Sequence, residues 1–257
     1  YTGLTQVAAG TLKLGANGGG TNTPLGTTGS GTTVLSGATL DLNGYTLGTT
    51  ESLSLAGTGV GGTAGALANT GSSASYSGLL TLTDHATVNA TGDITLSNSG
   101  TILGSGYTLT LTGTSSGSSL ASIVGTGAGG LTKSGTGTWT VSGSSTYTGL
   151  TQVTAGTLKL GANGGGTNTP LGTTGSGTTV LSGATLDLNG YTLGTAEGLS
   201  LAGTGVGGTA GALANSSATG ASYSGLLTLT DHATVNATGN ITLSNSGTIL
   251  GSGYTLT

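Results

Sequence analysis

Cysteine and arginine are absent from this sequence, and charged residues of any kind make up only 4% of its 257 positions. Without cysteine the chain can form neither a disulfide nor a zinc–thiolate site. Its lysines are Lys13, Lys133 and Lys159. A face that binds phosphate groups needs clustered Lys and Arg, so no nucleic-acid partner is expected. No run of about 20 apolar residues occurs, and we therefore expect no transmembrane segment.

Proline is nearly absent, whereas glycine is abundant. The prolines are Pro24 and Pro170, and the 56 glycines follow no three-residue period, which excludes a collagen-like triple helix. Disordered chains combine low hydrophobicity with high net charge. This chain is 33% apolar and has a net charge of only −4, so it can bury a core.

The sequence is a tandem repeat. Residues 1–69 recur at 147–215 with three differences, and residues 74–110 recur at 221–257 with Asn240 in place of Asp93 as the only difference. Near-identical copies in tandem are typical of repeat arrays. We interpret residues 1–257 as one continuous segment of a longer chain, with copies at 1–146 and 147–257, the second of them incomplete.

Short alternating segments predict an all-β fold. Leu or Ile alternates with Thr, Lys, Asp or Ser, between corners of Gly, Asn and Ser, in the runs 11–14, 39–43, 53–55, 80–83, 94–96 and 107–111. An antiparallel sandwich or barrel would use strands of about five or six residues joined by hairpins. The short strands and small corner residues favour a parallel β-helix (β-solenoid) with about 20–25 residues per turn. One repeat then corresponds to about seven turns, with no break expected at its boundary.

Alternation also predicts the direction of the side chains. Leu, Val and Ile are expected to face inward, while Thr, Ser, Lys and Asp face outward. Lys13 and Asp41 are 28 residues apart and could pair on neighbouring turns. Trp139 has the same parity as Val141, so we expect it to fill the core.

Asp84 and His85, repeated at Asp231 and His232, are the only acid–histidine neighbours. Adjacent residues of a strand point to opposite faces, so Asp84 is not expected to orient His85 for catalysis. The two pairs lie about seven turns apart and cannot share a metal ion. We expect both histidines to be solvated.

The other candidate calcium ligands are Asp41, Asp93, Asp187 and Glu51. Calcium takes about six to eight oxygens, and these residues are scattered, so we interpret them as solvated charges. A polysaccharide-acting enzyme on a β-helix needs clustered acids and a basic residue. We therefore expect no enzymatic activity and no catalytic, cofactor-binding or metal-binding residues.

Outward threonines and tyrosines are the remaining candidates for binding. The Thr-x-Thr pairs are Thr81/Thr83, Thr108/Thr110 and Thr138/Thr140. They resemble an ice-binding face but follow no single turn period, and outward Thr is common on strands. Exposed tyrosines would favour sugar binding, and we expect most of Tyr45, Tyr76, Tyr107 and their copies to lie at corners or partly in the core.

The segment 129–161 holds the most specific motif. It opens Gly-Gly-Leu-Thr-Lys-Ser-Gly-Thr-Gly-Thr, and continues with Tyr-Thr-Gly-Leu-Thr from Tyr147 and Gly-Thr-Leu from Gly156. It closely resembles the autotransporter-associated β-strand repeat, also called the passenger-associated transport repeat, and its second half recurs at 1–15. Trp139 departs from the family's pattern, which has an aliphatic residue there. The resemblance implies a right-handed parallel β-helix that is exported and displayed at the surface of a bacterium with an outer membrane.

Two functions remain open at this point. The first is a non-catalytic structural segment of an extracellular fibre or adhesin stalk. The second is a binding module for a carbohydrate, a host surface or ice, which would use the outer Thr, Asn and Tyr face. A solenoid without a polar cap has open strand edges, so we expect end-to-end continuation with further repeats or identical subunits.

Overall fold

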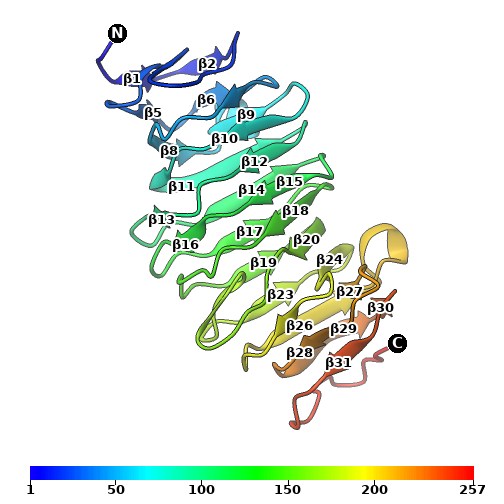
Figure 1. The fold of residues 1–257 in the computed structure, drawn as a ribbon. Coiled ribbons are helices and arrows are strands. Elements are labelled where there is room, and N and C mark those ends of the chain that lie inside the picture. Colours follow the sequence, from blue (N-terminus) through cyan, green and yellow to red (C-terminus); the bar gives the residue numbers. More distant parts are fainter.

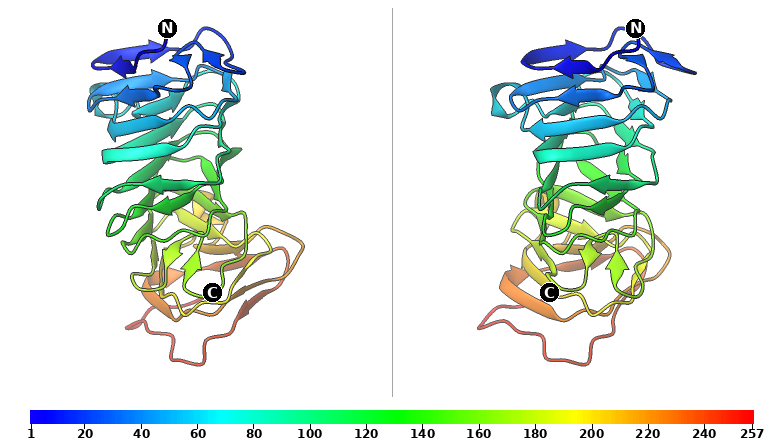
Figure 2. Two further views of the ribbon diagram at one scale, coloured as in Figure 1. Left: turned by 60° about the vertical axis from the view of Figure 1, so that its left-hand side comes forward. Right: turned by 90° about the vertical axis from the view of Figure 1, so that its left-hand side faces the viewer.

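Parallel strands stacked into a β-solenoid form the structure, a computed structural model that describes residues 1–257. The coil has about 10 turns of about 23 residues, with about 46% of the residues in strands and 2% in helix. Figures 1 and 2 show the strands stacked between an N-terminal and a C-terminal end. The predicted all-β parallel solenoid with 20–25 residues per turn is confirmed.

Each turn places strands on three faces, which we number I, II and III in chain order. Face I contains β1 (Thr5–Val7), β5 (Thr32–Val34), β8 (Leu53–Gly57), the start of β11 (Leu80–Ala90), β13 (Thr101–Leu103) and β16 (Ile123–Gly125). The same face later contains β25 (Thr192–Leu193), β28 (Ala221–Tyr223) and β31 (Ile241–Leu243).

Faces II and III carry the other ladders. Face II contains β2 (Gly10–Lys13), β6 (Ala38–Asp41), β9 (Leu67–Asn69), the end of β11, β14 (Leu109–Gly113), β17 (Leu131–Lys133), β19 (Thr151–Val153), β23 (Thr178–Val180), β26 (Leu199–Gly203) and β29 (Leu227–Ala233). Face III contains β7 (Thr46–Leu47), β10 (Ala74–Tyr76), β12 (Ile94–Leu96), β15 (Ser118–Leu120), β18 (Thr138–Val141), β20 (Gly156–Leu160), β24 (Ala184–Asp187), β27 (Leu213–Asn215) and β30 (Val235–Ala237).

The loops between the stacked strands contain short hairpins and 3-10 turns. Two antiparallel hairpins join β3 (Asn22–Thr23) to β4 (Gly26–Thr27) and β21 (Asn168–Thr169) to β22 (Gly172–Thr173). The helical elements are the short 3-10 turns η1 (Val60–Gly62) and η2 (Val206–Gly208). Neither they nor any other helix has the length and apolarity needed to cross a membrane.

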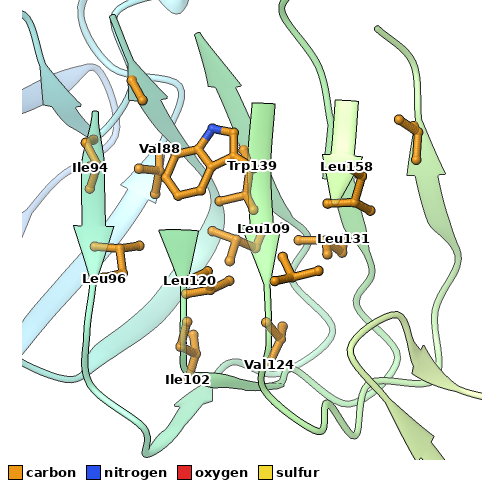
Figure 3. Packing of buried hydrophobic residues seen from close by; sticks show 14 of the residues in the cluster. Val88, Ile94, Leu96, Ile102, Leu109, Leu120, Val124, Leu131, Trp139 and Leu158 are labelled. Atoms are coloured by element: carbon orange, nitrogen blue, oxygen red, sulfur yellow. The ribbon is translucent and has the colours of Figure 1, made fainter. Parts of the chain in front are cut away.

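Rows of aliphatic side chains fill the interior. Val34, Leu55 and Leu82 occupy equivalent positions on successive turns and are all buried. One contiguous cluster unites 48 buried residues along the rod, and Figure 3 shows part of it from close by. Burying one such side chain stabilises the fold by about 1.5–3 kcal/mol.

Trp139 points into this core, as its parity with Val141 predicts (Figure 3). Its side chain is buried, and its indole Nε1–H donates a 3.0 Å hydrogen bond to the carbonyl oxygen of Thr112. It occupies the same register position as Leu158 on the next turn. The bulky ring thus replaces an aliphatic residue within one of the rows.

An Asx turn shapes the corner between faces II and III. The N–H of Asn43 donates to Asp41 Oδ1 at 2.9 Å, and Asn43 Nδ2 donates to the carbonyl of Leu14 on the preceding turn at 2.9 Å. Asn43 has φ 52°, and Asn is among the few residues that tolerate this conformation. The copy at Asn189, with φ 51°, repeats the arrangement.

The two sequence copies do not lie on the same faces. In the first copy β1 lies on face I, where it pairs with β5. Its counterpart in the second copy, β19, lies on face II, where it pairs with β17, which in turn pairs with β14. Likewise, β2 lies on face II, whereas its counterpart β20 pairs with β18 on face III. The second copy is therefore turned about the rod axis by one face relative to the first.

The length of the repeat explains this rotation. An offset of 146 residues at about 23 residues per turn gives ~6.3 turns, that is, six turns and one further face. The expectation of about seven turns per repeat was therefore too high. The parallel registers run through the boundary, because β17 pairs with β19 and β18 with β20.

Candidate functional site

The side chains of Asp84 and His85 do not bond to each other. The carboxylate Oδ1 of Asp84 accepts the backbone N–H of His85 at 2.7 Å. The imidazole Nδ1 of His85 accepts the backbone N–H of Thr108 on the next turn at 3.0 Å, and its ring meets Tyr107 edge-on with centroids 5.7 Å apart. Both groups are bound to the backbone, so neither orients the other.

The predicted opposite directions of Asp84 and His85 are wrong. Thr83, Asp84 and His85 are consecutive exposed residues of β11. The pairing register between β11 and β8 shifts between Leu82 and Ala86, where the strand bends from face I to face II. A bulge breaks strict alternation, which explains how both side chains reach solvent.

Asp41 is buried, although an outward solvated carboxylate was expected. Its Oδ2 accepts the Thr70 hydroxyl at 2.6 Å and lies 3.5 Å from Lys13 Nζ, which confirms the predicted pairing of neighbouring turns. Burial alone would raise the pKa of this carboxyl. Hydrogen bonds from Thr70 and Asn43, together with the charge of Lys13, outweigh that effect and lower the pKa below 3.8.

The copy of this arrangement joins Asp187 to Lys159, with 3.4 Å between Oδ2 and Nζ. Asp187 is buried as well, so it too is not a solvated charge. Asp93 is half-buried, and its Oδ1 accepts the N–H of Gly117 at 2.9 Å. No group of three or more His, Asp or Glu side chains lies close enough together to hold a metal ion.

Glu51 and Glu197 lie fully inside the coil, contrary to the expectation that Glu51 is solvated. The carboxylate of Glu197 accepts the hydroxyl of Thr178 at 2.6 Å and that of Thr169 at 3.2 Å. Tyr223 donates its hydroxyl to the Glu197 carbonyl at 2.7 Å. The copy at Glu51 makes the same bonds with Thr32, Thr23 and Tyr76.

The buried carboxylate of Glu197 forms no ion pair with a lysine or histidine side chain. Burial raises the pKa of its carboxyl from 4.5 to about 7, although the hydroxyls of Thr178 and Thr169 partly offset the rise by stabilising the charged form. Burial and the same carboxylate also raise the pKa values of Tyr147 and Tyr223, which therefore remain protonated donors. The cluster is thus a proton-sensitive part of the core.

Lys133 is buried as well and has no acidic partner. Its ammonium donates to the carbonyls of Ser134 at 2.7 Å, Gly135 at 2.9 Å and Ala155 at 3.0 Å. Burial lowers the pKa of this ammonium to about 8. Because Ala155 lies on the following turn, Lys133 links two turns next to the repeat boundary.

The tyrosines divide into buried and half-buried sets. Tyr76, Tyr147 and Tyr223 are fully buried, and Tyr45, Tyr107 and Tyr191 pack partly against the core. This agrees with the expected corner or core positions for all of the predicted tyrosines except Tyr254, the copy of Tyr107. The exposed aromatic residues are Tyr1 and Tyr254, at opposite ends of the rod.

The Thr-x-Thr pairs share no turn period, as expected, because they belong to the start of β11 on face I, to β14 on face II and to β18 on face III. A different threonine row, which was not predicted, runs along face II. Thr87, Thr110 and Thr132 occupy one register position on successive turns, and the row continues with Gln152, Thr179, Ser200 and Thr228. Gln152 interrupts the hydroxyl row near its middle. A groove of ≈ 260 Å³ lies on the second copy, and Thr, Ser and Asn make up most of its lining, which also includes Asp187.

Sequence reasoning missed the buried Lys133 and the two buried glutamates, yet a signal was present. Lys133 shares parity with the inward Leu131, and Glu197 shares parity with the inward Leu199. Alternation thus places both side chains inward, and only their charge suggested otherwise. Asp41 is different, because it lies opposite in parity to its inward neighbour Leu40, and Thr70 on the following turn bonds its carboxylate.

A family model described as the passenger-associated transport repeat matches residues 1–14 and 131–160. Residues 1–14 correspond to 147–160 in the second copy, and residues 131–146 end the first copy. The matched segments contain β1, β2 and β17 to β20. The chain is thus a parallel β-solenoid that carries the passenger-associated transport repeat, and the resemblance seen in the sequence is confirmed. No curated protein and no solved structure matches the chain.

Proposed function

We propose that the chain is a non-catalytic structural segment of an extracellular bacterial surface fibre or adhesin stalk. The observation that carries this proposal is the continuity of the parallel ladders through the repeat boundary, at β17–β19 and β18–β20. A ladder that links every turn to the next transmits load along the rod and sets a fixed length. The repeat family, which is associated with autotransporter passengers, supports display at the surface of a bacterium with an outer membrane.

The dimensions suit a spacer. About 10 turns at a strand spacing of ~4.8 Å give a rod about 48 Å long. The low content of charged residues, 4%, limits repulsion between equivalent positions on successive turns. The buried ionisable groups Asp41, Lys133 and Glu197 bond to the coil itself, which is a structural role for each of them.

Surface display tests the spacer role. An epitope placed beyond one or two copies of the 257-residue segment is expected to rise by about 48 Å per copy above the outer membrane. A Gly/Ser linker of equal length is the control, because a flexible chain gives a smaller and broader height distribution. Equal heights for one and two copies would contradict the proposal.

Binding through the outer face is the second candidate, and one surface feature favours it. His85, the half-buried Tyr107 and the exposed Leu103 lie on neighbouring turns and recur as His232, Tyr254 and Leu250. Aromatic and apolar groups beside polar ones suit a glycan or a host surface. Glycan-array binding by the purified chain that is lost in the Tyr107→Ser, Tyr254→Ser double variant would establish this function instead.

A further inference from the structure

A second groove lies on the second copy, between the loop that precedes β23 and the outer side of β23, β26 and β29, which lie side by side (Figure 1). Its volume is ≈ 210 Å³, and 10 residues line it, among them Gly177, Gly198 and Ser200. Further turns are present on both sides, because β19 pairs with β23, and Thr228 pairs with Leu250. The groove is therefore a feature of the coil between its ends.

One difference between the copies opens this groove. Nine of the 10 lining residues are identical at the counterpart positions of the first copy, and the exception is Gly198 in place of Ser52. No comparable groove occurs on the first copy. There, the hydroxyl of Ser52 lies over Gly31, whereas a Cβ at Gly198 would meet no other atom within 4 Å. A hydroxymethyl group thus fits the space that Gly198 leaves open.

Two leucines flank this space. Backbone hydrogen bonds align Leu150, Gly177, Gly198 and Leu226 on four successive turns, with the two glycines in the middle. The leucines are three strand spacings apart, ~14 Å. Leu150 is 42% exposed and Leu226 is half-buried, so both present apolar surface beside the glycines.

Uncharged hydroxyl groups line one side of the groove. Thr179, Ser200 and Thr228 occupy one register position on three successive turns. Thr178 donates its hydroxyl to Glu197, whereas those three hydroxyls make no hydrogen bond within the chain. No charged residue lines the groove. Phosphate and carboxylate ligands favour cationic partners, so this surface suits a neutral ligand with several hydroxyls.

We propose that the Gly198 groove binds one unit of a neutral glycan. The C–H groups of the sugar ring pack against the flanking leucines, and its ring hydroxyls bond to the row of Thr179, Ser200 and Thr228. A hydroxymethyl group of the sugar enters the space that Ser52 fills in the first copy. The groove is smaller than the ~300–1,000 Å³ of pockets for drug-sized ligands, so it holds a single sugar unit.

This site is separate from the surface formed by His85, Tyr107 and their copies. The Tyr107→Ser, Tyr254→Ser double variant should therefore keep it. Glycan binding here adds to the structural role proposed above, and either can fail without the other, because the height of a displayed epitope does not depend on this groove.

A titration followed by nuclear magnetic resonance tests the proposal. The neutral glycan bound most strongly on an array that also carries sialylated and sulfated glycans is added to the isotope-labelled full chain. One saturable site is expected, with shifts of the Gly177 and Gly198 amide signals. Gly198→Ser should weaken binding by more than about tenfold, because the serine side chain occupies the place of the ligand. This variant should fold, since serine stands at the counterpart position and the space around Gly198 is open.

The first copy allows a gain of binding in the same chain. Ser52→Gly should create a second site of similar affinity, so that the stoichiometry rises from one to two. Thr50→Ala is the matched control, because it introduces the neighbouring difference between the copies at a position whose counterpart, Ala196, does not line the groove. This control should leave the stoichiometry at one.

Other results would overturn the proposal. These are the absence of saturable binding of neutral glycans, an affinity that Gly198→Ser leaves unchanged, or a single site in Ser52→Gly. Stronger binding of the sialylated or sulfated glycans would show that the ligand is anionic and would contradict the assignment to a neutral glycan.

Discussion

At the scale of single residues, hydrogen bonds from buried polar side chains connect neighbouring turns of the solenoid. Glu197 accepts hydroxyls from Thr169 and Thr178, which belong to the preceding turn of the chain, and Lys133 bonds to Ala155 on the following one. A buried group whose bonds are lost costs far more than an exposed one. These residues therefore fix how one turn sits on the next.

Glu197 makes stability depend on pH. Its carboxyl has a pKa of about 7 in the folded chain, whereas the ordinary value, taken here for the unfolded chain, is 4.5. The folded chain therefore retains the proton to a higher pH than the unfolded chain. The stabilisation is complete below pH 4.5 and is lost as the pH rises through 7. The urea concentration at the midpoint of unfolding is therefore expected to decrease as the pH is raised from 4.5 to above 7.

The Glu197→Gln variant should show a shallower pH dependence, because the amide cannot ionise. Glu51 is present in both proteins, so the difference isolates Glu197. Asp231→Asn, at an exposed position, is the matched control and should keep the wild-type slope. An unchanged slope in Glu197→Gln would refute the assignment of this proton to the core.

Lys133→Met removes the ammonium that three carbonyls share. We expect a loss of about 1–3 kcal/mol in the free energy of unfolding, because the carbonyls of Ser134, Gly135 and Ala155 lose their buried donor. Lys159→Met breaks a partly exposed ion pair and a hydrogen bond to the exposed hydroxyl of Ser216, and it should cost ~0–1 kcal/mol. Equal losses in the two variants, measured by denaturant unfolding, would argue against the link through Lys133.

At the scale of elements, close contact between corners limits which residues can occupy them. Gly225 lies between β28 and β29, and a Cβ at this position would collide with the Glu197 carbonyl oxygen. Gly165 precedes the β21–β22 hairpin, and a Cβ at Gly165 would meet no other atom within 4 Å. Stacking therefore requires glycine at some corners and tolerates larger residues at others.

Gly225→Ala should destabilise the chain by about 1–3 kcal/mol or more, since the backbone of two turns must separate. Gly165→Ala should change the stability by less than about 0.5 kcal/mol. Thermal or urea unfolding of the two variants measures the difference. A tolerated Gly225→Ala would mean that this corner is looser than the structure describes.

Local alternation of apolar and polar residues predicts where most strands lie but not where they end. The run 94–96 coincides with β12, and the run 53–55 begins β8, because three alternating residues suffice to define inward and outward positions. The run 80–83 is only the start of β11, which continues to Ala90 around a corner. That continuation depends on pairing with β9 and β14, which are distant in sequence.

The candidate site could be predicted less well, since it depends on stacking between turns. The charges of Glu51 and Asp41 suggested solvent exposure, whereas threonines on other turns bond both carboxylates inside the coil. The row of Thr87, Thr110 and Thr132 also becomes visible only when the register is known. Charge and spacing predicted the pairing of Lys13 with Asp41 on neighbouring turns, but they did not show which threonines bond the buried carboxylates.

At the scale of the whole molecule, the sequence repeat and the structural period differ. One repeat covers ~6.3 turns, so features of the second copy are rotated by about a third of a turn relative to the first. The 3-10 turns η1 and η2 therefore lie at different corners of the rod. A long array of such repeats would present each outward loop around all three sides in succession.

The distance between spin labels at Thr63→Cys and Thr209→Cys tests this account most directly. Both residues are exposed, and each follows one of the two 3-10 turns. The axial separation of the copies is ~30 Å, from ~6.3 turns at ~4.8 Å. A continuous parallel coil with the copies rotated by one face predicts a distance by double electron–electron resonance well beyond this axial spacing. A single distance near 30 Å would place both loops on one side and contradict the one-face rotation.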